Sequence, residues 1–187
     1  MRRVPLSWAV FVLVLGGAAP SQAEPQANVG VTAGPVGVSS GRSWWTQTRL
    51  HLGVHGDVLF GRRRNADAAI GPFGEVLTSF EDVQLGTGVS GLLPVHPYLP
   101  LVVSGGGYGR HSSRWGWEPG VSAQVFWGSR SYNHRSAYVM AGGVRVEFRQ
   151  GLGESKERSV VVAAHLDGEV LLLPLMLAYE WLRGPPR

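Results

Sequence analysis

Two histidines and an aspartate alternate with apolar residues in the stretch from Arg49 to Phe60, RLHLGVHGDVLF. Imidazole and carboxylate groups bind transition metals and act in acid–base catalysis, so their spacing decides what they can do. On a strand, same-face side chains two positions apart lie about 6.6–7 Å apart, which separates His51 from His55 by about 13 Å. One ion at about 2.1 Å from each ring cannot span that distance. His55 and Asp57 would share an ion only with a third ligand from another strand, such as His165. The spacing therefore favours a polar wall, and no metal site is expected.

A second candidate for chemistry lies in the stretch 109–120, GRHSSRWGWEPG. Its His111 and Ser113, two positions apart, resemble the His-x-Ser pair of the outer-membrane lipid A deacylase family, whose members are β-barrel serine esterases. The resemblance implies that His111 is the base, Ser113 the nucleophile and Glu118 the acid that orients the imidazole. The chain departs from the family in having Arg114 in place of asparagine after the serine, and an acid that comes earlier. A membrane-embedded esterase stays an alternative; the expectation is a polar loop without catalytic residues.

Glycine-rich SGGGYGR at 104–110 is not a phosphate-binding loop, because the lysine and hydroxyl residues that complete such a loop are missing and no helix follows. We expect no cofactor. The net charge of +4 is small and scattered, which argues against nucleic-acid binding. The chain has no cysteine, which excludes disulfides and thiol catalysis.

The N-terminus has the three parts of a secretory signal. Arg2 and Arg3 precede a short apolar run at residues 6–17, and Ser21-Gln22-Ala23 places small residues where a signal peptidase reads them. We expect residues 1–23 to be a cleaved signal peptide and residues 24–187 to form a single domain.

The domain must be built from strands, because apolar residues recur with a period of two and form no helical stripe. Turn signals separate nine candidate segments, and the one at 28–38 is the weakest because Pro35 lacks a backbone donor. An up-and-down barrel needs an even number, so the pattern predicts an all-β fold, a closed antiparallel barrel of eight strands, with ten as the alternative. The nine segments are 28–38, 44–60, 70–80, 83–95, 99–110, 120–129, 136–150, 158–166 and 169–182.

The composition of the polar face indicates which side of the barrel is inside. Charged residues make up 16% of the chain, against about 25% in a typical soluble domain. Glycine, serine, histidine and paired arginine and glutamate suit a narrow interior, which predicts a polar lumen and an apolar exterior. The residues expected to line the lumen are Arg49, His51, His55, Asp57, Arg145, Glu147, Arg149 and His165. Aromatic residues near segment ends are expected to form girdles at the membrane interfaces, namely Trp44, Phe60, Trp127, Phe148, Tyr179 and Trp181.

From about Ala27 to Trp181 the chain resembles the small outer-membrane β-barrel proteins of Gram-negative bacteria. The resemblance rests on the signal peptide, the alternating strands of about ten residues and the aromatic girdles. It implies a non-enzymatic barrel in contact with outer-membrane lipid, with a structural role or surface partners bound through its loops. In such proteins the chain usually ends on an aromatic residue, whereas six residues follow Trp181 here. A secreted or periplasmic lipocalin-like barrel, with an apolar ligand inside, remains the other alternative.

Overall fold

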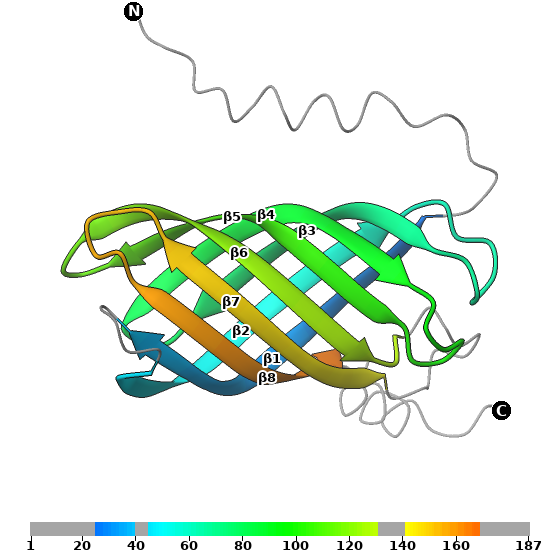
Figure 1. Ribbon diagram of the computed structural model, residues 1–187, viewed down its shortest axis with the longest axis horizontal. Coiled ribbons are helices and arrows are strands. Elements are labelled where there is room, and N and C mark those ends of the chain that lie inside the picture. Colours follow the sequence, from blue (N-terminus) through cyan, green and yellow to red (C-terminus); the bar gives the residue numbers. More distant parts are fainter. Residues whose placement is uncertain (1–24, 40–44, 131–140, 169–187) are drawn as a thin grey trace, which may run out of the picture.

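Eight antiparallel strands close into a barrel in the structure, a computed structural model that describes residues 25–39, 45–130 and 141–168. Each strand pairs with its neighbour in the sequence, and β1 pairs with β8 to close the barrel. The strands run obliquely to the long axis (Figure 1). The predicted closed barrel of eight strands is confirmed, and the alternative of ten is not. The strands are β1 (Gln26–Ser39), β2 (Gln47–Leu59), β3 (Ala69–Thr78), β4 (Asp82–Leu93), β5 (Leu101–Ser112), β6 (Gly116–Gly128), β7 (Gly142–Gly151) and β8 (Arg158–Asp167).

The segment at 28–38, which Pro35 made the weakest candidate, forms a strand in the structure. Strand β1 covers 14 residues and pairs with β2 from Gln26 to Val38, including Pro35 opposite Leu50. Towards β8 the paired positions pass from Ala33 directly to Val36. The proline thus lies at an interruption of one ladder, where its missing N–H costs no hydrogen bond.

Several predicted features lie outside the described residues. They are the signal peptide at 1–23, the ninth segment at 169–182, and Trp44, Tyr179 and Trp181 of the expected girdles. None of the described residues forms a helix long and apolar enough to cross a membrane.

The two faces of the barrel wall differ as the alternation predicts. On β6, outward positions alternate with buried inward positions along the strand. Leu50, Ile70 and Val144 are more than half exposed on the outside, while His55, Glu75 and Glu147 are at most 5% exposed inside. The predicted polar interior and apolar exterior are confirmed. The outward residues of β6 are Trp117, Pro119, Val121, Ala123, Val125 and Trp127; the inward ones include Glu118, Ser122, Gln124 and Phe126.

One end of the barrel is closed by apolar side chains, and we call it the closed end. Leu59, Ala69, Leu92, Val102 and Phe126 form a buried cluster there. The opposite end, which we call the mouth, carries the short connections 79–81, 113–115 and 152–157. The lumen therefore has an apolar floor and a polar opening.

The turn between β2 and β3 lies at the closed end and is held by hydrogen bonds among its own residues. Arg62 is buried and donates hydrogen bonds to the carbonyl oxygens of Arg64 and Asn65. The backbone N–H groups of Arg64 and Arg63 donate to the exposed Asp67 carboxylate, at 2.8 and 3.0 Å, and hold its pKa below the usual range. The arginine run thus shapes a turn, and one of its three side chains is withdrawn from solvent.

Candidate functional site: the polar interior and the mouth

A set of four charged side chains fills the middle of the lumen, and we call it the central cluster: Glu75, Arg145, Glu147 and Arg149. Arg145, Glu147 and Arg149 alternate along β7 and so share its inner face. Arg149 holds Glu147 with a two-bond fork, at 2.6 Å from Nε to Oε1 and 2.8 Å from Nη2 to Oε2. Arg145 pairs with Glu75 on β3. Because β3 and β7 are four strands apart in a ring of eight, this ion pair crosses the lumen and ties opposite walls together.

A second set lies towards the apolar floor, and we call it the closed-end cluster: Asn28, Asp57, Arg130 and His165. The Arg130 guanidinium donates to Asn28 Oδ1 at 2.7 Å and to Asp57 Oδ2 at 3.2 Å, and its Nη1 lies 3.2 Å from His165 Nε2. It also lies over the Phe126 ring, at 4.1 Å from the centroid. One arginine thereby joins side chains of β1, β2 and β8.

A third set closes the lumen beneath the mouth, and we call it the mouth cluster: Asp82, Arg110, Glu118 and Glu157. Arg110 lies 3.1 Å from Glu118 and 3.7 Å from Asp82, and it also pairs with Glu157. The Ser155 hydroxyl accepts a hydrogen bond from Arg110, and the Ser155 backbone N–H donates one to Glu118. Three carboxylates therefore surround one guanidinium that is itself buried.

Polar side chains connect the three clusters along the length of the barrel. Gln84 accepts from Arg149 at 3.0 Å and lies 3.5 Å from Asp82, which joins the centre to the mouth. His55 lies 3.4 Å from Glu75 and 3.6 Å from Asp57, which joins the centre to the closed end. Four arginines, Arg110, Arg149, Arg145 and Arg130, take part in this chain of contacts. What the arrangement does is hold eight strands at fixed distances around a filled interior.

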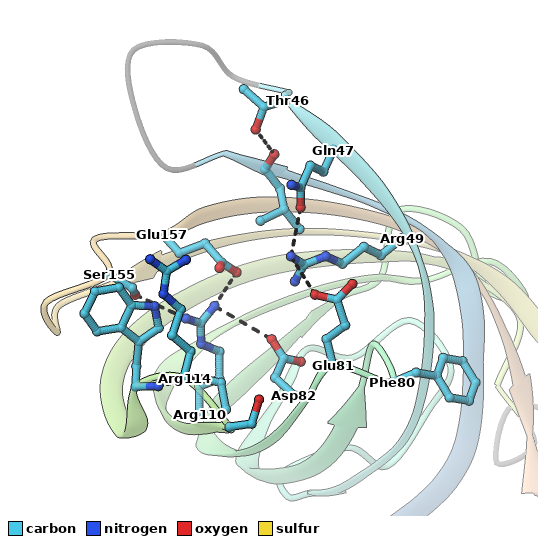
Figure 2. A pocket seen from close by; sticks show the side chains of 14 residues that line it. Thr46, Gln47, Arg49, Phe80, Glu81, Asp82, Arg110, Arg114, Ser155 and Glu157 are labelled. Carbon is cyan, nitrogen blue, oxygen red and sulfur yellow. Dashed lines mark hydrogen bonds and ion pairs between the residues drawn. The ribbon is translucent and has the colours of Figure 1, made fainter.

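Above the mouth cluster the barrel opens into a cavity of about 820 Å³, the mouth cavity, which is lined by residues of β1, β2, β4 and β5 and of the connections at this end. Figure 2 shows Arg49 beside Gln47 and Glu81, and Arg110 beside Asp82 and Glu157. Arg49 Nη2 lies 2.9 Å from Gln47 Oε1 and 3.0 Å from Glu81 Oε2. The cavity is lined by Val38, Thr46, Gln47, Arg49, Phe80, Glu81, Asp82, Arg110, Ser112, Ser113, Arg114, Trp115, Ser155 and Glu157.

Comparison with known proteins yields a likeness in structure and none in sequence. No protein-family model matches the chain, and no curated protein matches it. Among solved structures, the chain is similar to Ail, the attachment invasion locus protein of Yersinia pestis, determined in complex with the heparin analogue sucrose octasulfate. The identity is 7%, the TM-score is 0.47, and the match covers 79% of this chain and 98% of that one. No functional residue is carried across a likeness of this extent.

The structure brings His55, Asp57 and His165 to the same region of the lumen but puts a guanidinium among them. The rings of His55 and His165 have centroids 6.2 Å apart, and Arg130 lies within 3.2 Å of both Asp57 and His165. In the described part of the chain, no group of three histidine, aspartate or glutamate side chains is arranged to hold a metal ion. His165, the third ligand that the sequence suggested, thus lies in the same region as His55 and Asp57. The Arg130 guanidinium, however, lies beside the Asp57 carboxylate and neutralises its charge.

The other residues expected in the lumen are found on the inner face. His51 is buried with Nε2 at 3.4 Å from the Thr32 hydroxyl, and Arg49 stands at the opening. Of the aromatic residues expected in girdles, Phe60 and Trp127 face outward at the closed end. Phe148 also faces outward, but it pairs with Ala123 in the middle of β6.

The structure places two of the three residues of the esterase alternative, His111 and Glu118, on opposite faces of the barrel wall. His111 is exposed on the outer face, where its ring contacts Trp117 at 5.3 Å between centroids. Glu118 is buried on the inner face and bound to Arg110 and Ser155. Neighbouring strand positions point to opposite faces, so the wall of the barrel separates the two groups. Glu118 is therefore not beside the His111 ring in this structure.

Three residues on which the interior depends are not among those that the sequence was expected to place in the lumen: Glu75, Arg110 and Arg130. Glu75 shares its face with Phe73 and Leu77, so β3 shows no clean polar side in its sequence. Arg130 follows β6 in a stretch that reads as a turn, and Arg110 falls within the glycine-rich run. Continuing the inward parity of β6 two positions past Gly128 would have pointed to Arg130.

Glycines on the inner face make room for the large polar side chains. A Cβ atom on Gly86 would lie 2.8 Å from Cγ and Oε1 of Glu75, and one on Gly120 would overlap the Tyr108 ring. Both are direct strand partners of the residue they accommodate. The abundance of glycine in the chain therefore follows in part from the crowding of the lumen.

We predict that Gly86→Val lowers the free energy of unfolding by about 1–3 kcal/mol, because overpacking displaces Glu75 from its partners. Gly74→Val is the matched control, since Gly74 faces outward on the adjacent strand and a Cβ there meets nothing closer than 4.0 Å. Denaturant titration of the two variants, followed by tryptophan fluorescence, measures the difference. Equal stability would show that Glu75 has no fixed place beside Gly86.

Proposed function

We propose that the chain is a non-enzymatic β-barrel that spans the outer membrane of a Gram-negative bacterium and presents its mouth and loops to partners. The observation that carries the proposal is the outer line of β6. From Trp117 to Trp127 every outward residue is apolar, and the two tryptophans that bound this line are both more than half exposed. A soluble barrel has no physical reason to expose such a line, whereas a lipid-facing strand requires one.

The length of that line matches the thickness of a bilayer's hydrocarbon. The ten steps from Trp117 to Trp127 rise about 33 Å along the strand, and a tilt of about 40° reduces this to about 25 Å along the barrel axis. An apolar band about 25 Å tall between two aromatic belts is what an outer-membrane barrel presents to lipid. The tryptophans would thus lie at the two interfaces, where their amphipathic rings are favoured.

The remaining strands support the same band. Outward positions of β2, β4 and β7 carry Leu50, Leu85 and Val146, all exposed. Among the strands that the structure describes, the one charged residue that points outward is Arg158, the first residue of β8 at the mouth end. Charges are thus kept inside or at the rim, as burial in lipid demands.

The interior argues for a structural or binding role over transport. Arg130, Glu147 and His165 are among the largest side chains with almost no exposure, so they do not line an open channel. Eight strands leave an interior that side chains alone can fill. Solutes would reach the mouth cavity and stop at the mouth cluster.

Fractionation tests the proposal directly. Expressed from its full sequence in a Gram-negative host, the protein is expected in the outer-membrane fraction. It should migrate faster on a denaturing gel before boiling than after, because a closed barrel resists detergent unfolding. Release with the periplasmic contents, with one migration position boiled or unboiled, would contradict membrane insertion and favour the lipocalin-like alternative.

A further inference from the structure

The mouth cavity has the size of a small-molecule site, and the mouth cluster closes it on the side of the lumen. Its volume of about 820 Å³ falls within the range of about 300–1,000 Å³ that ligand pockets occupy. Beneath it, the space bounded by His51, Gln84 and Arg149 measures only about 10 Å³, roughly the room for one water molecule. A ligand would therefore rest on the mouth cluster and be held by the cavity walls.

The charges that line the cavity balance. Arg49, Arg110 and Arg114 face Glu81, Asp82 and Glu157. Arg110 is already surrounded by carboxylates, and Arg49 is already paired with Glu81 at 3.0 Å. A strongly anionic ligand would meet three carboxylates, and a strongly cationic one would meet three guanidinium groups. The walls therefore suit a ligand with no net charge.

The same walls mix hydrogen-bond donors and acceptors at close range. Arg49 uses Nη2 for Gln47 and Glu81, while its buried Nε has no hydrogen-bond partner in the described residues. Ser113 is exposed in the connection 113–115, and its hydroxyl group is part of the cavity wall. Hydroxyl groups of a ligand both donate and accept, so they match a surface of alternating guanidinium, carboxylate and amide groups.

An aromatic surface completes the site. Trp115 lines the cavity, is 43% exposed and lies beside Arg114, whose guanidinium carbon is 5.1 Å from the ring centroid. Phe80 also lines the cavity, but its ring points outward in Figure 2. An exposed indole gives a ligand's C–H surface an apolar contact while the polar walls bind its hydroxyl groups.

We propose that the mouth cavity binds an uncharged, hydroxyl-rich ligand of the class of short oligosaccharides. Trp115 serves as the apolar platform, and Arg49 with Gln47 and Glu81 binds the hydroxyl groups. The inference goes beyond the membrane-spanning role and does not depend on it, because the cavity is formed by the barrel itself.

Binding is measured on the purified full chain in a detergent without a sugar headgroup, by calorimetry or ligand-observed NMR. The probes are maltotriose and tri-N-acetylchitotriose as neutral trisaccharides, sucrose octasulfate as a polyanion and spermine as a polycation. We expect saturable binding of at least one neutral trisaccharide, and binding weakened at least tenfold by Trp115→Ala. Trp127→Ala is the matched control, because Trp127 is exposed on the outer face at the other end of β6. Gln47→Ala, at the rim, tests the polar wall independently and should weaken binding severalfold.

Three results would overturn the proposal. One is saturation by sucrose octasulfate or spermine with no binding of either neutral trisaccharide. Another is no saturable binding of any probe. The third is trisaccharide binding that both Trp115→Ala and Gln47→Ala leave unchanged, with each variant still running as a folded barrel on an unboiled gel. All of these are read in detergent, so they are independent of whether the protein fractionates with the outer membrane.

Discussion

Replacing Glu75 with alanine is expected to lower the free energy of unfolding by about 3–5 kcal/mol, because it leaves a buried guanidinium without its carboxylate. The Glu75 side chain is 1% exposed, pairs with Arg145 across the lumen and lies 3.4 Å from His55. Without it, Arg145 and Arg149 share the single carboxylate of Glu147. Equilibrium unfolding in lipid vesicles or detergent, followed by tryptophan fluorescence, gives the number.

The chain offers a matched control in Glu81→Ala. Glu81 also pairs with an arginine, Arg49, but its side chain is 65% exposed at the mouth. Exposed pairs contribute about 0–1 kcal/mol, so this variant should be close to the parent. Similar losses for the two variants would mean that the interior is hydrated enough to solvate Arg145, and that the central cluster does not hold the barrel together.

A double variant distinguishes the loss of the attraction between Glu75 and Arg145 from the cost of leaving the Arg145 charge buried without a partner. Glu75→Leu with Arg145→Met removes both members of the pair and leaves Glu147 bound to Arg149. Replacing a whole buried pair by apolar residues of similar volume is often neutral, so the double variant should be more stable than Glu75→Ala alone. If it is less stable, the pair contributes a net attraction across the lumen that packing cannot replace.

How much the sequence reveals differs from strand to strand, and the reason is physical. On β7 the charged residues Arg145, Glu147 and Arg149 alternate with Val144, Val146 and Phe148, so the order of residue types alone distinguishes the two faces. On β3 the inner face holds Phe73, Glu75 and Leu77 against an apolar outer face. Period-two reasoning detects a difference between faces, and where both are apolar it cannot place the one charge between them.

The sequence could not predict which inward-facing side chains pair across the lumen, for another reason. Alternation shows which residues point inward but not which walls they meet, because the distance from Glu75 to Arg145 is set by the closure and shear of the barrel. Arg130 illustrates the same limit from outside a strand. It follows the end of β6, yet it binds Asp57, which is 73 positions away in the sequence. Sequence reasoning considered His55, Asp57 and His165 as possible ligands of one metal ion, and the three do lie in the same region of the lumen. It could not show that Arg130 lies beside Asp57 and His165.

Ala123→Arg is expected to lower the free energy of unfolding in lipid vesicles by about 2–4 kcal/mol, because it places a charge at the middle of the apolar band that we propose to face lipid. Ala123 faces outward on β6, about midway between Trp117 and Trp127. Ala123→Met adds similar bulk without charge and should change stability by less than about 1 kcal/mol. The denaturant midpoint of each variant, measured in vesicles of one lipid composition, gives the comparison.

The position of the charge decides between lipid and water as the solvent of this surface. Leu93→Arg places the same charge at the last residue of β4, near the closed end, where the expected cost falls to about 0–1 kcal/mol. On a barrel surrounded by water, both positions are exposed surface, and both arginines would change stability by no more than about 0.5 kcal/mol. A cost that is large at Ala123 and small at Leu93 therefore requires a hydrocarbon layer centred on the middle of β6. Equal small costs would place the apolar wall in water and remove the main support for a membrane-spanning barrel.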